Sequence, residues 1–181
     1  MEVYDLGNFN KAVVWKGKAP IVFNQTAKEL KTVIHLNQNL VSTYTQIVME
    51  LKLARNSSYY ALLGVEYIPE ETSELLIKVE KSNNEHELYC SALGPKEIIY
   101  TGIPGEYADA IMIAAKKKIQ DAHWKYSGSI VFGLGAHSVV GSSESVFSKI
   151  TEILMVLLMN EFVLNSPWSD KNIIKEELLV T

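Results

Sequence analysis

The sequence predicts an α+β fold in which two helices lie on a β-sheet. Two segments of the carboxy-terminal half, 103–122 and 142–162, carry apolar residues at helical spacing. Segments rich in aliphatic residues lie between and after them, at 129–132 and 173–180, and these predict strands. The order helix, strand, loop, helix, strand is typical of helices packed on a sheet in an α+β or split βαβ arrangement.

Length and composition narrow the class of protein. The chain has 181 residues, the size of one domain, and its 48% hydrophobic and 21% charged residues are ordinary for a folded protein. The formal net charge of −4 excludes a strongly basic surface over the whole chain, so DNA is not an expected partner. The single cysteine, Cys90, excludes an intramolecular disulfide and a cysteine-based zinc site.

The sequence predicts no membrane contact. Its first residues lack the positive start and the apolar stretch of a signal peptide. The longest strongly apolar run, 153–159, would rise only about 10 Å as a helix, whereas a membrane span needs roughly 20 residues. We therefore expect a soluble, cytoplasmic protein.

The first part of the chain predicts short strands. Segments 12–15 and 21–23 are strand candidates on either side of a turn at 17–20, and 30–36 alternates between two faces. Segment 40–53 fits a helical stripe by its spacing but a strand by its Thr and Val content. Its periodicity leaves both structures open.

The middle of the chain predicts a hairpin. Segments 59–68 and 75–79 are rich in aromatic and branched residues and are joined by a turn at 69–73. A third strand is expected at 87–91, after a polar turn at 82–85.

Both predicted helices have local start signals. Pro104 and Glu106 stand in the first turn of one helix, where proline loses no needed N–H group and an acid faces the positive end of the helix dipole. The second helix opens with a capping serine at 142–143 and an early acid, Glu144. Between the two, segment 133–141 contains three glycines and is expected to be an exposed loop.

The second helix is apolar nearly all round between residues 153 and 159. A helix of that kind is covered on more than one side. We expect the sheet to cover one side, and either an amino-terminal extension, residues 1–18, or a second copy of the chain to cover the other. A homo-oligomer is therefore one expected state.

Few catalytic patterns are present. The chain has no Gly-x-x-x-x-Gly-Lys-Ser/Thr phosphate loop, and the segment 133–135 lacks the third glycine of a dinucleotide fingerprint. No histidine pair stands at metal-ligand spacing among His35, His86, His123 and His137. Ser138 is not part of a Gly-x-Ser-x-Gly elbow, and Cys90 is interpreted as a small buried hydrophobe. We therefore expect no catalytic residue, no cofactor, no metal and no enzymatic activity.

Three consecutive lysines, Lys116, Lys117 and Lys118, stand toward the end of the first predicted helix. They could contact phosphate groups, or they could be the solvated end of a helix, where cations complement the dipole. The acidic balance of the chain favours the second interpretation.

Two blocks of the carboxy-terminal half resemble a known family. Segment 102–107 (GIPGEY) resembles the Pro-x-Glu-Tyr step before a helix in domain IV of bacterial elongation factor G. Segment 135–147 (GAHSVVGSSESVF) is similar to the same domain's tip loop, with its histidine, and to the start of its following helix. Segment 20–26 weakly resembles its first strand. Ribosomal-protection tetracycline-resistance proteins carry a similar domain.

The resemblance implies a ribosomal protein S5 domain 2-like fold, a four-stranded sheet with two helices on one face. It implies one such domain over 19–181, without the GTPase part, preceded by the extension 1–18. In the family the domain tip reaches the decoding region of the small ribosomal subunit, and the tip histidine corresponds to His137. Two features of the family are not matched: its basic hairpin segment, near 55–60, and the acid before its serine pair, where this chain has Gly141.

Two functions are therefore expected. The first is a non-enzymatic module that binds the ribosome or RNA, with His137, Ser138 and the 133–141 loop as its contact tip and the lysines at 116–118 as a phosphate patch. The second is a protein-interaction or self-associating module of the same fold without RNA binding. The apolar 153–159 segment and the net charge of −4 favour the second.

Overall fold

The computed structural model describes residues 1–17, 28–54, 58–82, 87–94, 97–163 and 166–179. Within these ranges the chain is α+β, as predicted. The expected strand at 21–23 and the weak resemblance at 20–26 lie outside the described residues, as does His86. The elements are β1 (Glu2–Gly7), β2 (Asn10–Lys16), β3 (Lys28–His35), β4 (Thr45–Ala54), β5 (Ser58–Pro69), β6 (Glu74–Lys81), β7 (Ile99–Thr101), α1 (Gly105–Asp121), β8 (Gly128–Ser138), α2 (Glu144–Glu161) and α3 (Asp170–Leu179).

The strands form one mixed sheet in the order β1-β2-β4-β5-β8-β6-β3. The short strand β7 pairs with the last part of β8, beyond the reach of β6. The β6–β8 pairing is parallel and the other pairings are antiparallel. This eight-stranded sheet is wider than the four-stranded one that the family resemblance implies.

The predicted hairpin between 59–68 and 75–79 is wrong, because β8 lies between its two strands. Pro69 at the end of β5 and Leu75 at the start of β6 both pair with Gly128, so the connection passes over the start of β8. Gly128 has a φ of 128°, and a Cβ there would collide with the carbonyl oxygen of Ile68. Only glycine fits this crossing without strain, and the turn residues alone do not reveal it.

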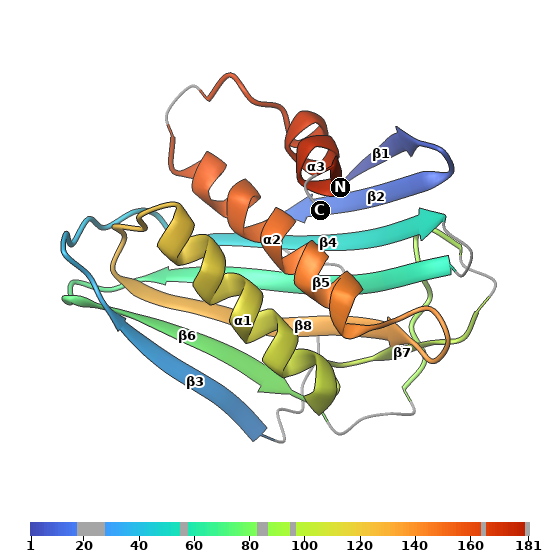
Figure 1. The fold of residues 1–181 in the computed structure, drawn as a ribbon, viewed down its shortest axis with the longest axis horizontal. Coiled ribbons are helices and arrows are strands. Elements are labelled where there is room, and N and C mark those ends of the chain that lie inside the picture. The colour runs from blue at the N-terminus through green and yellow to red at the C-terminus, as the bar shows by residue number, and fades with distance from the viewer. Residues whose placement is uncertain (18–27, 55–57, 83–86, 95–96, 164–165, 180–181) are drawn as a thin grey trace.

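Helices α1 and α2 lie side by side on one face of the sheet, as predicted (Figure 1). The predicted starts are confirmed: Pro104 precedes α1, and Ser143 caps α2 by accepting a hydrogen bond from the Val146 N–H at 3.3 Å. The main core lies between these helices and the sheet. Segment 87–93 packs on the opposite face, over a smaller core of Val13, Trp15, Val48, Tyr60, Leu62, Ile99 and Ala136.

The expected strand at 173–180 is wrong, because its described part belongs to helix α3. The Ser169 hydroxyl accepts a hydrogen bond from the Asn172 N–H, which caps this helix, and Ile173 and Ile174 are buried in the main core. Helix α3 packs on α2 and so covers α2 on a second side. The described residues 1–17 contribute β1 and β2 to the sheet.

Most of the undecided segment 40–53 is strand β4, and all but the last residue of 30–36 lies in the edge strand β3. In the described part of the chain, no helix has the length and apolar character needed to cross a membrane.

Candidate functional site

The predicted exposed loop at 133–141 is wrong over most of its length. Strand β8 continues to Ser138, paired with β5 on one side and with β7 on the other, so that only 139–141 form a turn. Its glycines permit close packing and do not mark a loop. A Cβ at Gly135 would collide with the Ile103 side chain. On the neighbouring strand β5, a Cβ at Gly64 would lie 2.8 Å from the Leu134 Cβ.

His137 is therefore not an exposed tip residue, because only 9% of its surface is exposed. Its Nδ1 lies 3.4 Å from the carbonyl oxygen of Gly102. Its ring is near those of Tyr100 and Tyr107, and each of these two ring centroids lies 6.2 Å from that of His137. An RNA base could stack on this imidazole only after the surrounding residues had moved.

Ser138 is completely buried and holds the turn that follows it. Its hydroxyl donates a hydrogen bond to the Glu97 carboxylate and accepts from the N–H groups of Val140 at 3.3 Å and Gly141 at 3.0 Å. Ser142 accepts from the Ser138 N–H and donates to the Tyr60 carbonyl at 2.6 Å. These bonds fit a turn and a helix start, and they leave neither hydroxyl aimed at a substrate.

The structure does not bring the three lysines to the same place as His137. They stand near the end of α1, about 15 Å along the helix from Tyr107, which lies beside His137. The Lys118 ammonium pairs with Glu177 of α3 at 2.7 Å, Lys116 is half-buried, and Lys117 is exposed. A joint contact by His137 and this lysine group is not supported by their placement.

A different set of residues is exposed at this end of the sheet. Leu88, Ile98, Val139 and Val140, which we call the tip surface, have exposed fractions of 71%, 60%, 69% and 75%. Leu88 forms a bridge with Tyr100, and Ile98 and Val139 adjoin the pair formed by Ile99 and Ser138. The four aliphatic side chains thus belong to three neighbouring segments of one sheet end.

Cys90 lies in the same region and is exposed, so its interpretation as a buried hydrophobe is wrong. The expected strand at 87–91 is reduced to the Leu88–Tyr100 bridge in this part of the structure. Segment 87–91 is therefore an edge, and the alternate side chains along it face solvent: Leu88 and Cys90 are exposed while Tyr89 is half-buried.

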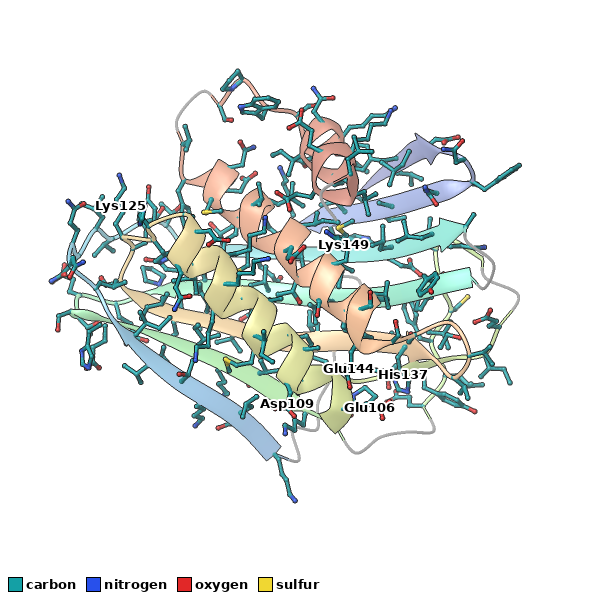
Figure 2. The ribbon with its side chains drawn as sticks, in the orientation of Figure 1. Glu106, Asp109, Lys125, His137, Glu144 and Lys149 are labelled. Carbon is teal, nitrogen blue, oxygen red and sulfur yellow. The ribbon has the colours of Figure 1, made fainter. Side chains whose placement is uncertain are left out.

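Acidic residues occur in the segments that carry the tip surface and in those that follow them. The described segments 87–94, 97–107 and 137–145 contain four acids, Glu87, Glu97, Glu106 and Glu144, and no Lys or Arg. Glu106 and Glu144 lie beside His137 in Figure 2. Burial, first of all, and with it the hydrogen bond to Glu106 and the charges of Glu106 and Glu144, together raise the pKa of Tyr107 to about 12.

The predicted contact residues His137 and Ser138 are buried, and the exposed side chains at this end of the sheet are others. Val139 and Val140 were within the predicted loop, whereas Leu88 and Ile98 were missed because exposure depends on which strands pair. No group of three or more potential metal ligands occurs among the residues that the structure describes.

Comparisons with protein-family models, with curated proteins and with solved structures found no match for this chain.

Proposed function

We propose that this chain is a non-catalytic protein-binding module that engages its partner through the tip surface. One observation carries the proposal: four exposed aliphatic side chains belong to neighbouring segments at one end of the sheet, and the described segments there contain four acids and no Lys or Arg. An apolar centre with a polar margin is the usual anatomy of a protein interface. The turn 139–141 is held by the Ser138 hydroxyl, so Val139 and Val140 need little ordering on binding.

The acids favour a partner with basic residues around an apolar patch. Opposite charges across an interface speed the encounter and exclude partners of the wrong sign. The same acids repel phosphate groups, which makes RNA or the ribosome a poorer fit to this surface. They also oppose a symmetric contact with a second copy, because two such surfaces would place like charges against each other.

Site-specific photo-crosslinking in cells that naturally express the chain tests the proposal. A photoreactive phenylalanine analogue replaces Val140 in one variant and Val33 in the control variant, since Val33 is half-exposed on the distant edge strand β3. We expect a discrete protein adduct from position 140 only. Ile98→Lys in the position-140 variant should weaken this adduct, whereas Lys at the exposed Ile113 of α1 should not.

Three results would contradict the proposal. Equal yields from positions 140 and 33 would show that the tip surface is not a preferred contact. A nuclease-sensitive adduct would assign it to RNA, and an adduct at twice the chain mass would assign it to self-association.

A further inference from the structure

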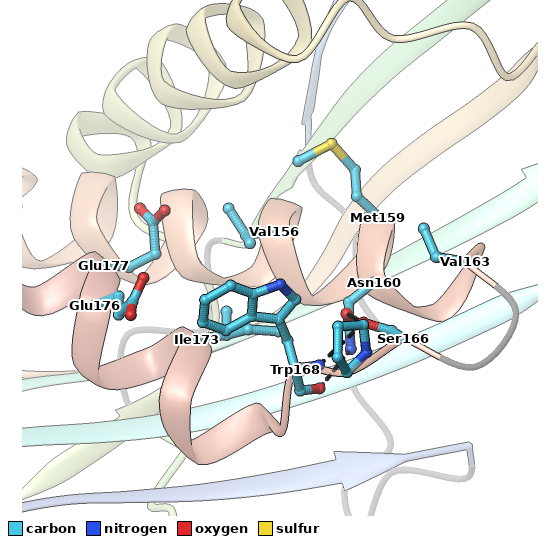
Figure 3. Close-up of a pocket in the computed structure, with 10 residues that line it drawn as sticks. Val156, Met159, Asn160, Val163, Ser166, Trp168, Ile173, Glu176 and Glu177 are labelled. Carbon is cyan, nitrogen blue, oxygen red and sulfur yellow. Dashed lines mark hydrogen bonds between the residues drawn. The ribbon is translucent and has the colours of Figure 1, made fainter.

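A second feature, separate from the tip surface, is a pocket between α2, α3 and the segment that joins them (Figure 3). Its volume is about 450 Å³, which lies in the range of small-molecule sites. Val156 and Met159 of α2, Ile173 of α3 and the indole of Trp168 form its apolar wall. This combination of size and lining would hold one apolar group.

Asn160 holds Ser166 and Trp168, which line one wall of the pocket. Its side-chain amide donates to the Trp168 carbonyl at 3.3 Å, and its amide oxygen accepts a hydrogen bond from the Ser166 hydroxyl. The Trp168 N–H donates to the same hydroxyl at 3.3 Å. Ser166 and Trp168 are therefore held in place without a ligand, which lowers the entropy that binding must overcome.

Trp168 is unusual among the three tryptophans of the chain. Trp15 and Trp124 are only 6% and 7% exposed, whereas Trp168 is 51% exposed although it borders the pocket. A half-exposed indole offers both an apolar surface and a π face that attracts cations.

Two carboxylates line the pocket, and one of them is neutralised by a lysine. Glu176 and Glu177 line it, and Glu177 is paired with Lys118 at 2.7 Å. Glu176 is exposed and takes part in none of the ion pairs found among the described residues. A carboxylate next to an indole and an aliphatic wall is complementary to a cation with an apolar body.

We infer that the α2–α3 pocket binds a small amphiphilic cation, an ammonium group carried on an aromatic or branched aliphatic body. The body packs against Val156, Met159 and Ile173, and the ammonium group lies near the Trp168 ring and the Glu176 carboxylate. This site is independent of the tip surface, so either proposal can fail without the other.

Three probes with one carbon skeleton and different charge test the inference on the full chain. They are phenylbutylamine, phenylbutanol and phenylbutyrate, titrated while the amide and indole NMR signals are recorded. We expect saturable shifts centred on Trp168, Asn160 and Ile173. The amine should bind about twofold to fivefold more tightly than the alcohol, and the acid more weakly than the alcohol.

Matched variants separate the charge from the apolar wall. Glu176→Gln should remove the preference for the amine and leave alcohol binding unchanged, while Glu71→Gln, which removes an exposed acid elsewhere, should change neither. Trp168→Ala should weaken all three probes. The inference is overturned if the acid binds as tightly as the amine, if the shifts scatter over other exposed side chains such as Phe9, or if no probe saturates.

Discussion

The side chain of Glu50 binds segment 91–92 to the sheet through hydrogen bonds. Glu50 is on β4, is completely buried, and lies on the side of the sheet where Val48 and Tyr60 form part of the smaller core. One carboxylate oxygen accepts from the Tyr60 hydroxyl at 2.8 Å and from the Ser91 hydroxyl, and the other accepts from the Ala92 N–H at 3.1 Å. Segment 91–92 is thereby held against the sheet next to the residues that carry Leu88 and Cys90.

Glu50→Ala should lower the free energy of unfolding by about 3 kcal/mol, because it leaves three donors without their acceptor in a site shielded from water. Glu50→Gln should cost less, since one amide oxygen remains to accept. The measurement is urea unfolding, with the exposed Glu71→Ala as the control, expected within about 0.5 kcal/mol of wild type. A Glu50→Ala variant as stable as that control would show that segment 91–92 does not depend on this carboxylate.

The raised pKa of Tyr107 leads us to expect a loss of stability at high pH. Its pKa is raised to about 12, whereas an unfolded tyrosine titrates near about 10. A group with a raised pKa in the folded state stabilises fully below the unfolded pKa, and this contribution is lost as the pH rises toward the folded pKa. Stability should therefore fall between about pH 10 and pH 12.

Tyr107→Phe keeps the ring that stacks on Phe147 at 4.6 Å and should make this alkaline fall shallower. Glu106→Gln should lower the pKa of Tyr107 in an NMR titration, because it removes the charge next to the hydroxyl while the burial remains. An unchanged alkaline slope in Tyr107→Phe would assign the fall to other groups.

At the scale of single elements, the sequence predicts those whose signals are local. Helices α1 and α2 were predicted because proline, a capping serine and an apolar stripe all lie within the helix itself. Helix α3 was missed because 173–180 has apolar pairs at its ends that suit a strand as well. What decides its structure is tertiary: Ile173 and Ile174 bury against α2, which no local pattern shows.

Ser143→Ala tests the cap of α2 and should cost about 1 kcal/mol, because it removes the acceptor for the Val146 N–H. Ser143→Gly should lower the free energy of unfolding by only about a few tenths of a kcal/mol. The exposed Ser145 stands inside the first turn, and Ser145→Ala should change the free energy of unfolding by less than about 0.5 kcal/mol. Equal effects at both positions in a chemical denaturation experiment would contradict the assignment of the cap.

At the scale of the whole molecule, the hydrophobic pattern of the sequence does not determine which strands pair. Segments 59–68 and 75–79 are predicted to form a hairpin because turn residues separate them and consecutive strands usually pair. Strand β8, about fifty residues later in the chain, inserts between them instead. The same limit explains why segment 133–141 is predicted as a loop. Its glycines suggest a loop, and only the pairing of β8 with β5 and β7 shows that most of this segment is a strand.

In the amino-terminal part of the chain, β2 pairs with β4 and covers the edge that β4 would otherwise expose. Residues Ala12, Val13, Val14 and Trp15 are at most 6% exposed, and Lys16 pairs with Glu161 at 2.6 Å and with Asp170 at 2.8 Å. Deleting residues 1–16 should expose the edge of β4 and produce aggregates or a swapped dimer in size-exclusion chromatography. Deleting residues 1–7 removes only the largely exposed β1, and the protein should keep the elution volume of the full chain and its cooperative thermal unfolding. A monomeric, equally stable chain without residues 1–16 would instead show that the sheet is complete at β4 and that the amino terminus is a dispensable extension.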